Sequence, residues 1–149
     1  MIENYANVTG RLAVVLFGAD GGVKQEFEVP NLVVSAGLAF IASRMKDTTD
    51  AAMTHMGVGS GTTAAAAGNT ALETQIGSRA SLTSTTVTAN ATAYAASFAA
   101  GVGTGAITEA GIFNASTSGT MLCRTVFAVV NKGANDTLQI TWTITLNAA

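Results

Sequence analysis

The stretch that decides the fold class is Leu138 to Leu146, which reads L-Q-I-T-W-T-I-T-L and alternates apolar and polar residues throughout. Successive side chains of a β-strand point to opposite faces of the sheet, so this stretch forms a strand with one apolar and one threonine-rich face. A helix would distribute the five apolar residues around its circumference, and the strand is the better interpretation. We expect Trp142 to lie on the buried face, inside the protein or at a subunit boundary.

Further strand-like segments follow one another along the chain, most of them separated by glycine or Asn/Asp turns. Residues 11–17 and 23–29 flank the turn G-A-D-G-G, which predicts a β-hairpin that ends at Pro30. The other predicted strands are 53–58, 79–88, 91–99, 107–114, 120–130 and 138–146. About eight strands with such turns indicate one all-β domain over residues 1–149, an antiparallel β-sandwich or jelly-roll-like fold.

One short α-helix is predicted within this β-fold. Ser35 is the expected N-cap, and the apolar residues that follow at helical spacing are Leu38, Ile41, Ala42 and Met45. Two segments are expected to lack regular structure: a flexible N-terminal arm at 1–10 and a long loop at 59–78, rich in Gly, Thr and Ala. We expect these two segments to reach neighbouring subunits.

The composition favours a protein whose surface is partly covered by other subunits. The chain is 48% hydrophobic but only 11% charged, whereas an average soluble domain has about 25% charged residues. No apolar run approaches the about 20 residues of a membrane-spanning helix, so we expect no membrane partner. The apolar surplus therefore predicts an oligomer, and we expect a homotrimer.

Charge and cysteine content narrow the functional classes further. A net charge of −2 without a basic run argues against a nucleic-acid partner. The first residues, M-I-E-N-Y, lack the basic and apolar regions of a secretion signal, which predicts synthesis in a cytoplasm. The single cysteine, Cys123, cannot form an intrachain disulfide and is expected to pack as a small hydrophobic residue.

Candidate catalytic and metal-binding groups are few. The segment G-V-G-S-G-T-T at 57–63 is similar to a phosphate-binding loop but lacks its lysine and following helix. His55, the only histidine, has no carboxylate or thiolate partners at metal-ligand spacing, so we expect it to face a polar neighbour or a subunit boundary. The threonine face at 138–146 fits a solvated strand better than an ice- or carbohydrate-binding array, because only this strand shows it cleanly. We predict no enzyme activity, no cofactor and no metal.

Glu109 is the residue for which the sequence predicts a defined structural role. It is the only acidic residue between positions 73 and 136, and it lies in an apolar strand. A carboxylate in such a strand is costly to bury unless it is paired. Since Arg79 and Arg124 are the only cations between positions 46 and 132, we predict a structural ion pair of Glu109 with Arg124 or Arg79.

Several longer motifs resemble those of small virion proteins of tailed bacteriophages. These motifs are N-L-V-V at 31–34 leading into Gly37, M-G-V-G-S-G-T-T at 56–63, N-T-A-L-E at 69–73 with Arg79, I-T-E-A-G-I-F-N at 107–114, G-T-M-L-C-R-T-V-F at 119–127, and the segment 132–146. The resemblance covers most of the chain after Pro30, and among such proteins it is greatest to capsid decoration (cement) proteins. It implies assembly in the host cytoplasm and a trimer on the virion surface, near threefold positions of the capsid, that links neighbouring copies of the major capsid protein.

Two other functional classes stay open. A trimeric tail-fibre or baseplate component of a tailed phage shares similar segments, but it would expose aromatic or polar clusters at its loop tips. In this chain the loops carry Ala, Gly, Thr and Ser instead. An enzyme would require a convergent set of titratable groups, which the sequence does not show.

Overall fold

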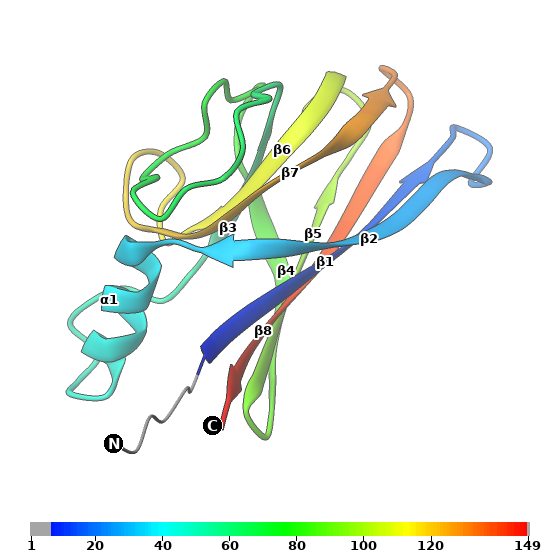
Figure 1. Ribbon diagram of the computed structural model, residues 1–149. Helices are drawn as coiled ribbons and strands as arrows, with labels where there is room; N and C mark the ends of the chain where they lie inside the picture. The colour runs from blue at the N-terminus through cyan, green and yellow to red at the C-terminus, as the bar shows by residue number, and fades with distance from the viewer. Residues whose placement is uncertain (1–6, 149) are drawn as a thin grey trace.

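Eight antiparallel strands form a closed barrel in the computed structural model, which describes residues 7–148 (Figure 1). Helix α1 (Ser35–Arg44) lies between the second and third strands. The strands are β1 (Asn7–Phe17), β2 (Val23–Val33), β3 (His55–Gly59), β4 (Ala80–Thr88), β5 (Ala91–Phe98), β6 (Gly105–Phe113), β7 (Met121–Lys132) and β8 (Thr137–Asn147). Around the barrel their order is β1-β2-β7-β6-β3-β4-β5-β8, and β8 pairs with β1 to close it.

The all-β prediction is confirmed, but a barrel replaces the expected sandwich or jelly roll. Two short ladders make this difference. β2 pairs with β7 through Leu32 and Val33, and β3 pairs with β4 through His55 and Met56. These ladders join the edges of larger groups of strands and close the barrel, although β2 before Leu32 pairs only with β1 and β4 beyond Ser81 pairs only with β5. Alternation along a strand reports which face is buried but not which neighbour closes the sheet.

The first two strands form the predicted hairpin, but both are longer than expected. Residues 7–10, which were assigned to a flexible arm, belong to β1 and pair with β8. The rest of that arm, residues 1–6, lies outside the described residues. β2 also continues through Pro30 to Val33 instead of ending at the proline. Since β7 pairs with β2 only beyond Pro30, the proline has a ladder on one side, where proline is tolerated.

Helix α1 lies where it was expected but buries a different face. Gly37 and Phe40 are its buried residues, whereas Leu38 and Met45 of the predicted apolar stripe are 45% and 87% exposed. Gly37 packs directly on β7, where a Cβ would overlap the carbonyl oxygen of Leu122. The stripe was misassigned because glycine contributes no hydrophobic side chain, although its small size permits the closest approach.

The start of α1 is completed by a distant loop. The N-cap is Val34, which makes no side-chain cap, and the expected cap Ser35 is the first helical residue. The N–H of Ser35 donates to the carbonyl of Ala67 at 2.8 Å. The loop between β3 and β4 therefore satisfies one of the N–H groups that a helix leaves free at its first turn.

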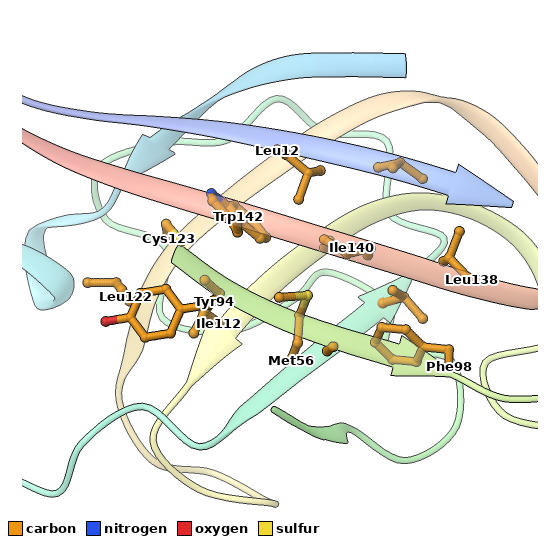
Figure 2. Packing of buried hydrophobic residues seen from close by; sticks show 14 of the residues in the cluster. Leu12, Met56, Tyr94, Phe98, Ile112, Leu122, Cys123, Leu138, Ile140 and Trp142 are labelled. Atoms are coloured by element: carbon orange, nitrogen blue, oxygen red, sulfur yellow. The ribbon is translucent and has the colours of Figure 1, made fainter. Parts of the chain in front are cut away.

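The barrel interior is filled by large apolar side chains from all sides (Figure 2). Trp142 is fully buried among them, as its position on the alternating strand predicted. It pairs across the sheet with Leu12 of β1 and Tyr94 of β5, so the three strands contribute one continuous layer. Among the described residues the indole Nε1 of Trp142 has no hydrogen-bond partner.

Candidate functional site

The long loop between β3 and β4, residues 60–79, lies against its own barrel. Leu72 packs against Phe113 of β6 and Met121 of β7, which are fully buried. These residues form a small apolar cluster on the outside of the barrel wall, separate from the main core. The sequence correctly indicated a long loop over residues 59–78, but Gly59 is part of β3, and the loop is fastened to the same chain.

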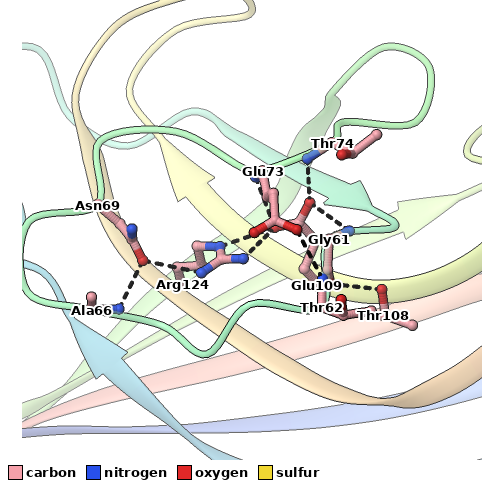
Figure 3. A network of polar contacts seen from close by, with 9 residues as sticks. All are labelled: Gly61, Thr62, Ala66, Asn69, Glu73, Thr74, Thr108, Glu109 and Arg124. Carbon is pink, nitrogen blue, oxygen red and sulfur yellow. Dashed lines mark hydrogen bonds and ion pairs between the residues drawn. The ribbon is translucent and has the colours of Figure 1, made fainter.

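Glu109 of β6 is the residue that fastens this loop (Figure 3). Its fully buried carboxylate accepts hydrogen bonds from three backbone N–H groups of the loop. Gly61 and Thr74 donate to Oε1 at 3.0 and 2.8 Å, and Glu73 donates to Oε2 at 3.0 Å. The hydroxyl of Thr108 also donates to the carbonyl of Gly61 at 2.7 Å. Hydrogen bonds to a charged group contribute about 1.5–3 kcal/mol each, so this carboxylate is a strong attachment point.

Arg124 of β7 is the cation that pairs with Glu109. Its Nε donates to Oε2 at 2.9 Å, and its Nη2 lies at the same distance in ion-pair contact without hydrogen-bond geometry. The two side chains are only 2% and 0% exposed. Nη1 of Arg124 donates to Oδ1 of Asn69 at 3.1 Å, and this oxygen also accepts the N–H of Ala66 at 2.8 Å. The ion pair thus holds a second part of the loop.

The hydrogen bonds of Glu109 favour its ionised form. Burial acts in the opposite direction and is the largest single influence, since it raises the pKa of a carboxyl group. The N–H groups of Thr74 and Glu73, followed by Arg124 and Gly61, outweigh burial and lower the pKa of Glu109 below its ordinary value. Glycine is needed for this geometry, because a Cβ on Gly61 would lie 2.6 Å from Oε1.

Arg79, the other predicted partner of Glu109, lies at a different place. Its guanidinium is 3.5 Å from the centroid of the Phe113 ring, a cation–π contact. Nη1 donates to the carbonyl oxygens of Ala115 and Ser118 at 2.9 and 2.8 Å. Burial lowers the pKa of Arg79 from its ordinary value. Arg79 therefore fixes the turn between β6 and β7 against the end of the loop.

The other residues that the sequence singled out are His55 and Cys123. Nδ1 of His55 lies 2.8 Å from the hydroxyl oxygen of Thr54, and Nε2 lies 3.4 Å from that of Ser81. Cys123 is fully buried, and burial raises the pKa of its thiol, so it remains a protonated packing residue. Within residues 7–148, no three His, Cys, Asp or Glu side chains lie close enough to hold a metal ion. Nor does this part of the chain contain a helix with the length and apolar character needed to cross a membrane.

An outer face made of small residues lies on the opposite side of the barrel from Glu109, since β8 is four strands away from β6. On β8 this face carries Thr141, Thr143 and Thr145, which alternate with the buried residues of the strand. Their paired neighbours are Ala95, Ala93 and Ala91 on β5 and Ala13, Arg11 and Thr9 on β1. We call these nine residues the Thr/Ala face. Its one charged side chain, Arg11, pairs with Glu28 at 2.6 Å.

Sequence reasoning missed the extent of the Thr/Ala face. The threonines were visible in one strand, but the alanines that flank them come from strands more than 40 and about 130 positions away in the chain. Only the pairing register places these residues side by side. The alternation of β1 and β5 was the available signal, but without the register it does not identify a shared surface.

Comparisons with known proteins assign no family to the chain. No family model, curated protein or solved structure matches it. Its class is therefore inferred from its own residues and geometry.

Proposed function

We propose that the protein is a structural virion protein of a tailed bacteriophage, a capsid decoration protein that binds the outside of the head as a homotrimer and stabilises the shell. The observation that carries this proposal is the Thr/Ala face on the outside of a closed barrel. Small uncharged side chains can approach a partner closely over a broad area. In a closed barrel most strands pair on both sides, which favours contacts through such faces or loops over contacts through strand edges.

The buried polar groups support a scaffold. The carboxylate of Glu109 and the guanidinium of Arg124 are occupied by contacts within the chain, and both are shielded from solvent. A general acid or base must reach a substrate, and these two groups do not. Their contacts fit the fixing of a long loop on a rigid body.

Stabilisation of a shell follows from ordinary binding thermodynamics. A protein that binds only the assembled capsid stabilises it by mass action. Three copies that bind together convert weak single contacts into strong attachment, because the second and third contacts form at high effective concentration. The low charge of the chain, 11%, is consistent with a surface partly covered by other copies and by the major capsid protein.

A trimeric tail-fibre or baseplate component is the second candidate. The observation that favours it is Val87, which lies one residue from the end of β4 in the β4–β5 hairpin and is 69% exposed. An exposed valine near a hairpin tip offers an apolar contact point for a receptor, although it is not the aromatic or polar cluster expected of a receptor-binding tip. The Thr/Ala face is the broader surface, so head decoration is the preferred proposal.

Binding to purified heads tests the proposal through the Thr/Ala face. Thr143→Arg places a long charged side chain in the middle of the face, next to Arg11 and Ala93. Thr49→Arg is the matched control, because Thr49 is exposed in the loop after α1. We expect the control to co-sediment with heads and Thr143→Arg to be lost from them at unchanged melting temperature. Equal binding of both variants would contradict the role of this face.

A further inference from the structure

A cleft of about 390 Å³ opens at the end of the barrel beside α1. The helix forms one wall, and the ends of β4, β5 and β8 form the other. Its apolar lining includes Phe40, Ile41, Met53, Val87 and Leu146. The volume lies within the range of about 300–1,000 Å³ that is typical of small-molecule sites.

The cleft leaves aliphatic surface uncovered. Val87 is 69% and Leu146 is 43% exposed, and both belong to the strand wall of the cleft, across from α1. Phe40 and Met53, at 9% and 5%, close the bottom and connect the cleft to the main core. An aliphatic chain laid between these residues would cover them and release water from apolar surface.

Two polar groups converge on the same cleft. Tyr94 is 9% exposed and lines the cleft. Figure 2 shows its hydroxyl directed outward from the packed cluster. The guanidinium of Arg44 lies over the ring of Phe40, 5.9 Å from its centroid. It donates one hydrogen bond, from Nη1 to the carbonyl of Asp50 at 2.9 Å, which leaves further N–H groups available.

The charge of the residues that line the cleft favours a negatively charged ligand. Arg44 is the only charged residue that lines the cleft, and no Asp or Glu lines it. Arg44 forms no ion pair within residues 7–148. A planar guanidinium with free N–H groups matches a carboxylate in shape and charge, and a phenol hydroxyl can donate a further hydrogen bond.

We propose that this cleft binds a small amphipathic carboxylate, with its aliphatic chain between Val87, Leu146 and Phe40 and its carboxylate on Arg44 and the Tyr94 hydroxyl. This binding is independent of the proposed attachment to a phage head, because the cleft shares no residue with the Thr/Ala face.

Titration of the full chain with octanoate tests the proposal, with the neutral octanamide as the matched ligand. We expect saturable shifts of the Val87 and Leu146 methyl resonances, and about tenfold tighter binding of octanoate than of octanamide. Arg44→Gln should remove that preference, and Tyr94→Phe should reduce it. Lys46→Gln is the matched control, since Lys46 is a neighbouring exposed cation outside the cleft, and it should keep the preference unchanged. Melting temperatures of all variants establish that they are folded.

Three results would overturn the proposal. Absence of saturable shifts with octanoate would show that the cleft is not a ligand site. Equal binding of octanoate and octanamide, or equal effects of Arg44→Gln and Lys46→Gln, would show that it does not recognise a carboxylate.

Discussion

Replacing Glu109 by glutamine removes one charge from the centre of the loop attachment while keeping the side chain's size. In Glu109→Gln, Arg124 remains a buried cation, only 2% exposed, without its counter-ion. The amide also presents N–H groups where the carboxylate accepted hydrogen bonds, so one of the N–H donors at Gly61, Glu73 or Thr74 faces another donor.

The expected destabilisation of Glu109→Gln follows from these contacts. Removing one partner of a buried ion pair destabilises a protein by about 3–5 kcal/mol. For a chain of this size each kcal/mol shifts the melting temperature by about 2–4 °C, so a decrease of about 6–20 °C is expected. Domains of this kind are stable by about 5–15 kcal/mol in total, and the variant therefore loses a large part of that margin.

Urea unfolding followed by tryptophan fluorescence measures this loss, because Trp142 is the only tryptophan and is fully buried. Glu28→Gln is the matched control. This variant breaks the ion pair of Glu28 with Arg11. The two side chains are 54% and 65% exposed, and an exposed ion pair contributes about 0–1 kcal/mol. The double variant Glu109→Gln/Arg124→Gln should recover part of the loss, since it removes the unpaired cation.

A small effect would refute this reasoning. If Glu109→Gln lowers the free energy of unfolding by no more than Glu28→Gln does, the buried pair does not fasten the loop. Hydrogen exchange at the amides of Gly61, Glu73 and Thr74 gives an independent readout. In Glu109→Gln the protection of these three amides from exchange should fall by more than the protection of the amides in β8.

Three further predictions concern pH, packing and the core. The pKa of Glu109 in the folded protein lies below its ordinary value of 4.5. The contribution of Glu109 to the free energy of unfolding is therefore fully present above pH 4.5 and is lost as the pH falls through the folded pKa. Urea unfolding at a series of acid pH values should show a steeper loss of stability below about pH 4.5 in the native protein than in Glu109→Gln. Gly37→Ala should cost about 1–3 kcal/mol by overpacking against the Leu122 carbonyl, whereas Gly68→Ala, where nothing lies within 4 Å, should be close to neutral in the same assay. Trp142→Ala should cost about 3–5 kcal/mol, measured by circular dichroism, and should lose head binding only together with its fold; loss of binding at an unchanged melting temperature would contradict its placement in the core.

The strands were accessible from the sequence because alternation is a local signal. The predicted strands 138–146 and 79–88 end within one position of β8 and β4. Closure of the barrel could not be predicted from the sequence, since it depends on two ladders of two residues each, one of which joins β2 to β7, far apart in the chain. The buried face of α1 was missed for a related reason, because the contact of Gly37 depends on the path of β7.

The attachment of the β3–β4 loop to the barrel could be predicted in part from the sequence. An isolated acid in an apolar strand requires a partner, and this argument identified Glu109 with two candidate arginines. The choice of Arg124 rests on the pairing of β6 with β7, which places the two side chains on one face. The three loop N–H groups were beyond prediction, because backbone donors carry no sequence signature and depend only on the path of the loop.

The central claim, that this protein decorates the outside of a phage head, is tested most directly by immunogold electron microscopy of intact virions. Antibody raised against the folded protein is applied to virions of the tailed phage that the proposal takes as the source of the chain. The proposal predicts gold particles distributed over the head surface and absent from the tail. Label confined to the tail or baseplate, or absent from intact virions, would contradict it.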